Sequence, residues 1–192
     1  MTDLPKRQLG RTGLHVTMLG YGAMELRGAP RGRDISEAQA ETVLNAVLDS
    51  GINYIDTSID YGLSEERVGR YLSRRRDEFY LASKCGCVVG APSGSRGERL
   101  PHLFTRENIV AGVEQSLRRM KVDYIDIVQF HVSPSPLTLK EANRRCFAGS
   151  KPCMPVCHCI PTIAPLTGCN RASAIRKAAG SQNSNWSQYG GA

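Results

Sequence analysis

The chain has 192 residues, 41% of them hydrophobic, and a formal net charge of +7 at pH 7, which suits one domain or one domain with a tail. Residues 140–192 contain seven basic residues and one acid, so the excess positive charge belongs to this tail, and a nucleic-acid-binding face on the main body is excluded. The apolar runs are shorter than the roughly 18 residues of a membrane helix, and the N-terminus lacks the apolar segment of a secretory signal, so we expect a cytoplasmic protein with no membrane partner.

The first predicted elements are strands. Residues 7–16, RQLGRTGLHV, contain two short strand patterns around a glycine turn, which is typical of a β-hairpin. The following run over residues 16–22, VTMLGYG, predicts a compact apolar strand that ends in glycines.

Residues 36–50 are predicted to form an amphipathic helix. Ser36 and Gln39 have the spacing of a capping box, and Gly51 stands where a glycine favours the end of a helix. One face carries apolar residues at helical spacing, namely Ala40, Val43, Leu44, Val47 and Leu48.

Three further strands are predicted to alternate with two further helices. The strands are INYIDT (52–57), FYLASK (79–84) and YIDIVQFH (124–131), and the helices run over about 64–75, with Ser64 as N-cap, and from Thr105. The Gly/Pro/Ser-rich residues 85–104 predict a long loop, a kind of segment that is often functional. This order indicates an α/β fold with a parallel sheet, either doubly wound or part of a (β/α)8 barrel.

Four residues that can handle protons lie at or just after the carboxyl ends of these strands, where ligands bind in parallel α/β folds: Asp56, Tyr61, Lys84 and His131. A lysine ammonium lowers the pKa of a nearby phenol, a carboxylate holds that lysine, and a neutral histidine hydrogen-bonds a substrate oxygen. The set suits protonation of a carbonyl oxygen while a nicotinamide cofactor delivers hydride. Each residue alone has a structural explanation, as a cap, a turn aromatic, a solvated strand end or a loop histidine, but their shared position favours catalysis.

The segments that carry these residues resemble the aldo/keto reductase family over about residues 6–139. The resemblance lies in LGRTGLHVTMLGYGAM (9–24), GINYIDTSIDYGLSEERVGRYL (51–72), YLASKCG (80–86) and FTRENIVAGVEQSLRRMKVDYIDIVQFHVSPSP (104–136). It implies a (β/α)8 barrel that reduces an aldehyde or ketone with NADPH or NADH and needs no metal. It also implies the roles of individual residues: a catalytic tetrad of Asp56, Tyr61, Lys84 and His131, with Tyr61 as general acid, and cofactor contacts at Gly22, Ala23, Met24 and Asp56.

The alternation of strands and helices stops near residue 139. We therefore expect residues 1–139 to form the N-terminal half of such a barrel, and residues 140–192 to be an irregular basic tail rather than a domain. Half a barrel has strand edges without partners, so we expect a truncated product with weak or no activity alone and with self-association through these edges. The alternative is a non-catalytic fragment that pairs with itself or with a full-length relative.

The cysteines and loop cations have weaker signals. A metal-binding module in the tail is a second alternative, although the spacing of Cys153, Cys157, His158, Cys159 and Cys169 matches no standard zinc arrangement. Cys85 and Cys87 could be a redox pair or simply two small residues at a strand end, and the second interpretation is favoured. A solvated position is likewise favoured over an anion-binding one for Arg96, Arg99 and His102.

Overall fold

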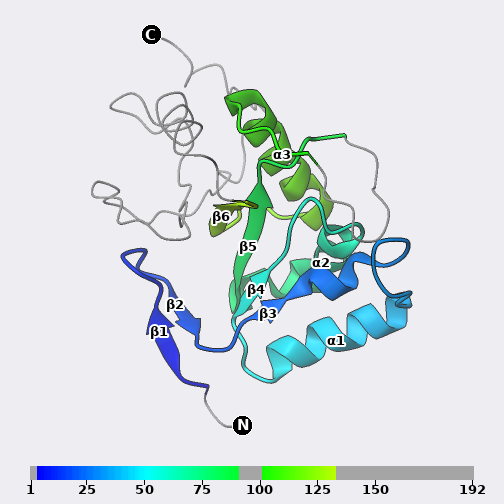
Figure 1. The fold of residues 1–192 in the computed structure, drawn as a ribbon. Coiled ribbons are helices and arrows are strands. Elements are labelled where there is room, and N and C mark those ends of the chain that lie inside the picture. The colour runs from blue at the N-terminus through cyan, green and yellow to red at the C-terminus, as the bar shows by residue number, and fades with distance from the viewer. Residues whose placement is uncertain (1–3, 91–100, 133–192) are drawn as a thin grey trace.

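The structure is a computed structural model that describes residues 4–90 and 101–132. In these residues a two-stranded hairpin precedes a four-stranded sheet, and helices α1, α2 and α3 lie on the same side of that sheet (Figure 1). The predicted tail and the boundary at residue 139 lie outside the described residues. No helix within the described ranges is long and apolar enough to cross a membrane.

The N-terminal hairpin is confirmed, but the strand that was expected to follow it is divided. Strands β1 (Lys6–Gln8) and β2 (His15–Thr17) pair antiparallel, and only Tyr21–Gly22 at the end of VTMLGYG form β3 of the main sheet. Between β2 and β3, Met18 and Leu19 are 60% and 58% exposed. At Gly20 an added Cβ would lie 2.5 Å from the Tyr54 ring, so the close approach of this ring requires glycine.

The main sheet is parallel and has the order β3-β4-β5-β6. Its strands after β3 are β4 (Tyr54–Asp56), β5 (Tyr80–Cys85) and β6 (Ile127–Phe130), which confirms the predicted α/β fold with a parallel sheet. Ile55, Leu81 and Val128 are at most 1% exposed and place the core between this sheet and the helices. The described strands follow one another in the sheet in the order in which they occur in the chain. A doubly wound sheet reverses its strand order at one point, whereas a sequential order is typical of a barrel.

Helix α1 (Glu37–Asp49) begins and ends as its sequence predicts. The Gln39 backbone N–H donates to Ser36 Oγ at 3.2 Å, and the Ser36 N–H donates to Gln39 Oε1 at 2.9 Å. Gly51 has φ of 89°, a conformation that favours glycine. The apolar face is narrower than predicted, because Ala40, Leu44 and Leu48 are buried while Val43 is 38% exposed.

Helix α2 (Ser64–Leu72) follows β4, and its predicted N-cap was wrong. Leu63 occupies the N-cap position, whereas the Ser64 hydroxyl donates to the Ala23 carbonyl at 2.8 Å and lies 2.9 Å from Thr57 Oγ1. Ser64 thereby joins the start of α2 to the short helix η1 (Ala23–Arg27). The chain continues after Leu72 as the 3-10 helix η2 (Ser73–Glu78), so the α-helix is shorter than expected.

Helix α3 (Arg106–Met120) begins at its predicted position, with Thr105 as N-cap. Its inner face packs on α2 so closely that a Cβ at Gly69 would lie 2.5 Å from the Met120 Cα. This packing holds the segments before β5 and β6 together on the helical side of the sheet.

Candidate active site

The four side chains expected at the strand ends come from neighbouring elements. Asp56 ends β4, Lys84 is the penultimate residue of β5, and His131 directly follows β6. Tyr61 lies in the loop between β4 and α2, where its N–H donates to the Ser58 carbonyl at 3.0 Å. Parallel pairing brings all of these segments to the same edge of the sheet.

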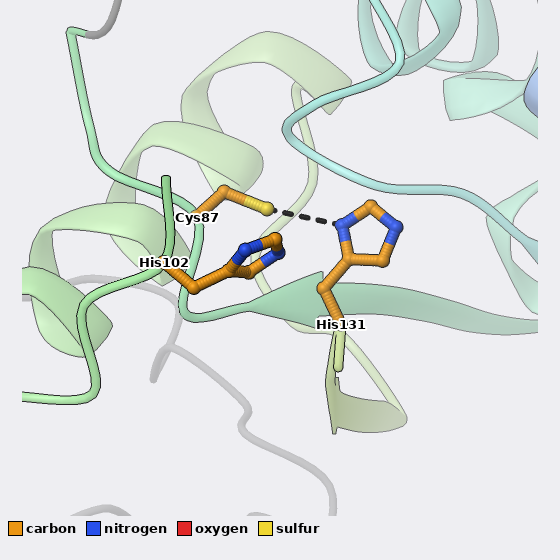
Figure 2. Close-up of side chains that lie close together, drawn as sticks. All are labelled: Cys87, His102 and His131. Carbon is orange, nitrogen blue, oxygen red and sulfur yellow. Dashed lines mark hydrogen bonds between the residues drawn. The ribbon is translucent and has the colours of Figure 1, made fainter. Parts of the chain in front are cut away.

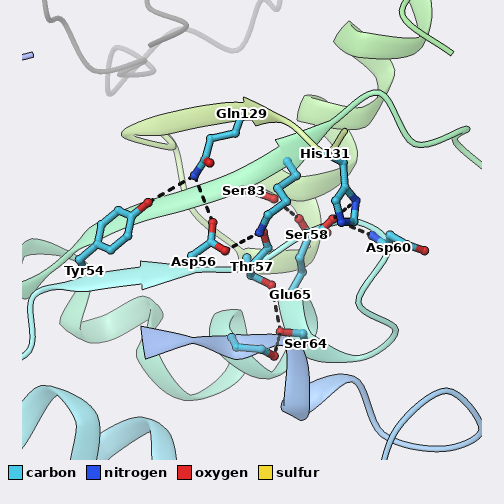
Figure 3. Close-up of polar contacts among 12 residues, drawn as sticks. Tyr54, Asp56, Thr57, Ser58, Asp60, Ser64, Glu65, Ser83, Gln129 and His131 are labelled. Atoms are coloured by element: carbon cyan, nitrogen blue, oxygen red, sulfur yellow. Dashed lines mark hydrogen bonds and ion pairs between the residues drawn. The ribbon is translucent and has the colours of Figure 1, made fainter. Parts of the chain in front are cut away.

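Lys84 and Asp56 form an ion pair between adjacent strands. The Lys84 ammonium also donates to the Thr57 carbonyl at 2.9 Å, and Gln129 Nε2 donates to the second oxygen of Asp56 at 3.2 Å (Figure 3). The side chains of Lys84 and Asp56 are only 13% and 26% exposed. The charge of Lys84 is therefore held in place by two oxygen partners, the Asp56 carboxylate and the Thr57 carbonyl, and Gln129 in turn holds the carboxylate.

Tyr61 completes the convergence. Lys84 Nζ lies 4.8 Å from the centroid of the Tyr61 ring, and the rings of Tyr61 and His131 meet edge to face with centroids 5.4 Å apart. The structure thus brings all four predicted residues together at one edge of the sheet.

His131 is held as a neutral imidazole at pH 7. Burial, and next the nearby charge of Lys84, lower its pKa from the ordinary 6.5 to about 4. Its Nδ1 lies 3.2 Å from Ser58 Oγ and 3.0 Å from Cys87 Sγ. Since the hydroxyl and the thiol can both donate to Nδ1, this arrangement favours the tautomer that carries its proton on Nε2.

The residues expected to contact a cofactor occupy different environments. Gly22 and Asp56 line a cavity of about 440 Å³, together with Arg7, Tyr54 and others. Met24 is 40% exposed, whereas Ala23 is fully buried in the core and its carbonyl already accepts the Ser64 hydroxyl. Gly22 and Asp56 are therefore the two of this set that face a common open space.

Sequence reasoning missed two residues of the site, Tyr54 and Gln129. The Tyr54 hydroxyl accepts from Gln129 Nε2 at 3.3 Å, and burial, followed by the charge of Asp56, raises the Tyr54 pKa to about 12. Strand alternation could have identified both, because Tyr54 precedes Asp56 by two residues and Gln129 precedes His131 by two, which puts each pair on one face. The register confirms this geometry, since Lys84 pairs directly with Gln129.

The loop after β5 differs from its prediction in one respect. Cys85 and Cys87 are both buried and form no disulfide, in agreement with the favoured interpretation. His102 was expected to be solvated, but it is only partly exposed and its Nε2 is buried without a hydrogen-bond partner. It packs against Phe104, with ring centroids 6.2 Å apart, which explains its withdrawal from solvent. Arg96 and Arg99 lie outside the described residues.

Comparison with known proteins identifies relatives of this arrangement. The model of the aldo/keto reductase family matches residues 18–181. A D-threo-aldose 1-dehydrogenase of Pseudomonas is 35% identical over 136 residues, which are 62% of this chain and 41% of that protein. An L-galactose dehydrogenase of Arabidopsis thaliana is 33% identical over 68% of this chain and 39% of its own length.

Solved structures agree with the sequence relatives. An aldo-keto reductase from Bacillus halodurans, solved in its holo form, superposes with a TM-score of 0.57 at 34% identity, over 74% of this chain and 47% of that one. The chain spans about two fifths of the length of the curated relatives named above. The family match continues through residue 181, so it includes part of the segment after residue 139 in which the sequence pattern is irregular.

Proposed function

Because the chain belongs to the aldo/keto reductase family of oxidoreductases, we propose that it reduces an aldehyde or ketone to an alcohol with NADPH or NADH. The observation that carries this proposal is the convergence of the Tyr61 ring, the Lys84 ammonium and the neutral His131 imidazole beside Asp56.

Tyr61 is the group that gives a proton to the carbonyl oxygen. An ordinary phenol is a poor acid at neutral pH, but a cation close to the ring stabilises the phenolate that remains after transfer. Lys84 supplies that cation at 4.8 Å from the ring centroid. Asp56 and the Thr57 carbonyl fix the ammonium in this position, so the stabilisation is present before the substrate arrives.

His131 orients the carbonyl. With Nδ1 directed at Ser58 and Cys87, the Nε2–H of the neutral ring is available to donate a hydrogen bond to the substrate oxygen. A protonated ring beside Lys84 would add a second positive charge at the same place, and the low pKa of His131 prevents this near pH 7.

The cavity beside Asp56 supports the proposal of a nicotinamide cofactor. The cavity beside Asp56 is open next to the Gly22 backbone, where an added Cβ would meet no atom within 4 Å, so a flat ring can approach the main chain. A nicotinamide cofactor bound there would supply the hydride that the side chains cannot supply.

We propose that the activity of this chain alone is weak. The binding energy that orders a dinucleotide comes from contacts along its whole length, and among the described residues the cavity at Gly22 and Asp56 offers contacts to one part of it. Weak cofactor binding raises the KM for the cofactor, and imprecise placement lowers kcat as well.

Cofactor binding and turnover test the proposal. NADPH and NADH are titrated by their fluorescence, and NADPH oxidation is followed with simple aldehydes and with aldoses, since two relatives are named for sugar substrates. We expect Tyr61→Phe to retain cofactor binding and to lose at least ~100-fold in kcat, because the proton donor is absent. Tyr80→Phe, at the opposite end of β5, is the matched control and should leave kcat unchanged.

A non-catalytic fragment that pairs with itself or with a longer relative is the second candidate. It is favoured by the outer strands β3 and β6, which have a neighbour on one side only among the described residues. Absence of cofactor binding at millimolar NADPH and NADH, in a chain that is folded by circular dichroism, would favour this candidate over the reductase.

A further inference from the structure

The cluster of Cys87, His102 and His131 lies beside the tetrad and offers a set of metal ligands. One ligand atom from each residue lies within 4.8 Å of the others, and Cys87 Sγ is 3.0 Å from His131 Nδ1 (Figure 2). We propose that these three residues form a Zn²⁺ site that ties the loop after β5 to the end of β6. This goes beyond the proposed reduction and departs from the expectation that the protein needs no metal.

The ligand types and spacings suit zinc. One thiolate and two imidazoles are ligands that Zn²⁺ prefers, and a three-residue set leaves the fourth position for water. Around a tetrahedral zinc ion, ligand atoms are separated by roughly 3.3–3.6 Å. The three ligand atoms lie within 4.8 Å of one another, and the distance from Cys87 Sγ to His131 Nδ1 is 3.0 Å, so these values lie on either side of the range. Side-chain rotations that move the ligand atoms by about 1 Å would complete the tetrahedral geometry.

Backbone pairing holds two of the ligands in place before any metal binds. Cys87 and His102 form an antiparallel bridge, flanked by bonds from the Leu103 N–H to the Gly86 carbonyl at 2.7 Å and from the Val88 N–H to the Pro101 carbonyl at 3.2 Å. Bonds at these flanking positions make Cys87 and His102 a non-hydrogen-bonded pair, the kind in which side chains lie closest.

Asn108 on α3 fixes this pair further. Its side-chain amide donates to the Cys87 carbonyl at 3.0 Å and to the Leu103 carbonyl at 2.8 Å, and its oxygen accepts from the Val89 N–H at 3.1 Å. The third ligand is fixed independently, because the His131 N–H donates to the Cys85 carbonyl at 3.0 Å. All three ligands thus stand on hydrogen-bonded backbone, which lowers the ordering cost of binding.

An unsatisfied nitrogen of His102 is independent evidence for a ligand at this cluster. Its Nε2 is buried and makes no hydrogen bond, although an unsatisfied buried nitrogen costs about 1–3 kcal/mol. Coordination of the metal by His102 satisfies an imidazole nitrogen of its ring. At Cys87 the metal takes the place of the thiol proton, and this proton is released to solvent. On His131 the metal takes Nδ1, so the proton remains on Nε2 and the ring is still able to donate to a substrate oxygen.

The test is direct binding, with Co²⁺ as the spectroscopic probe and Zn²⁺ as its competitor. The parent protein is the full chain with Cys146, Cys153, Cys157, Cys159 and Cys169 changed to serine, so that the tail contributes no thiolate. We expect thiolate-to-cobalt absorption in the near ultraviolet, visible bands of tetrahedral cobalt, loss of both on addition of Zn²⁺, and a Tm that rises with Zn²⁺ concentration.

Matched substitutions assign the ligands. Cys87→Ser should abolish the thiolate absorption, and His102→Phe, which keeps a ring against Phe104, should weaken binding at least tenfold. Cys85→Ala, which removes the neighbouring buried thiol, should leave the spectrum unchanged. Circular dichroism of the metal-free variants establishes that each is folded.

Three outcomes would overturn the site. The first is a parent protein without thiolate absorption at micromolar Co²⁺, and the second is absorption that persists in Cys87→Ser. The third is a signal in the natural chain that vanishes with the five tail cysteines, which would assign metal binding to the tail. None of these measurements uses turnover, so they test the zinc site independently of the proposed reductase activity.

Discussion

At the scale of single residues, the position of each site residue follows from strand alternation and from parallel pairing. Asp56, Lys84 and His131 could be predicted from the sequence because each stands at or next to a strand end. The contacts between them could not, because the partners come from segments that are 28 residues or more apart in the chain. His102 escaped prediction for the same reason, since its burial depends on pairing with Cys87 across the loop.

The ion pair between Lys84 and Asp56 is expected to matter for stability as well as for chemistry. Lys84→Met leaves the partly buried Asp56 carboxylate with no cation, so we expect a loss of about 2–3 kcal/mol in the free energy of unfolding. Adding Asp56→Asn should restore at least ~1 kcal/mol of this loss, because the unpaired charge is then absent. Urea unfolding of the two single variants and the double variant measures the coupling. A double variant whose losses simply add would contradict a direct interaction.

The low pKa of His131 predicts how stability depends on pH. The unfolded chain binds a proton at this histidine near pH 6.5, whereas the folded chain binds it only near pH 4. As pH falls through this window, protonation favours the unfolded chain and the free energy of unfolding decreases. This contribution is fully present above pH 6.5, and on the order of 1 kcal/mol of it is lost by pH 5, because solvent around the partly exposed ring screens the effect.

His131→Gln lacks the titrating group and therefore isolates this effect from other titrations. Urea unfolding at pH 7 and pH 5, in the presence of a chelator, should show a larger decrease for the natural chain than for His131→Gln, on the order of 1 kcal/mol. Equal decreases in the two proteins would mean that the imidazole titrates alike in the folded and unfolded chains.

At the scale of elements, the sequence predicted helices better than the short first strand. The capping box of α1 and the N-cap of α3 are local signals that the structure confirms. The run VTMLGYG was predicted as one strand because its composition is apolar, but its two ends pair with different sheets and exposed Met18 and Leu19 connect them. At α2, the Ser64 hydroxyl donates to the Ala23 carbonyl and accepts from the Thr57 hydroxyl, and these two buried hydrogen bonds outweigh its preference for capping.

The crossing of α2 and α3 depends on the absence of a side chain at Gly69. We expect Gly69→Ala to destabilise the fold by at least ~2 kcal/mol, because its Cβ would stand 2.5 Å from the Met120 backbone. Thermal and urea unfolding measure this loss.

Gly112 in α3 provides the matched helical control. A Cβ there meets Ile59 at an ordinary contact distance of 3.5 Å, so Gly112→Ala should be neutral or stabilising by about 0.5–1 kcal/mol through helix propensity. If both substitutions had the same effect, close helix packing at Gly69 would not be the cause.

At the scale of the whole molecule, the described sheet ends on both sides in strands with one neighbour, β3 and β6. Beside β3, the connecting residues Met18 and Leu19 expose apolar side chains. Strand edges next to exposed apolar surface favour association with another chain. We therefore expect the sedimentation coefficient of the protein to rise with concentration in the micromolar range.

Leu19→Lys places a charge beside this edge and should weaken association severalfold, whereas Val43→Lys, on the outer face of α1, should not. A monomer that sediments independently of concentration and melts cooperatively would argue against association through the sheet edges.

The antiparallel bridge between Cys87 and His102 fixes both ends of the chain segment that connects them. Asn108 stabilises this bridge by donating to the Cys87 and Leu103 carbonyls. The separation of Cys87 and His102 is set by these hydrogen bonds and not by the segment that connects the two residues. Substitutions that leave this bridge and Asn108 intact should therefore leave the backbone positions of Cys87 and His102 unchanged.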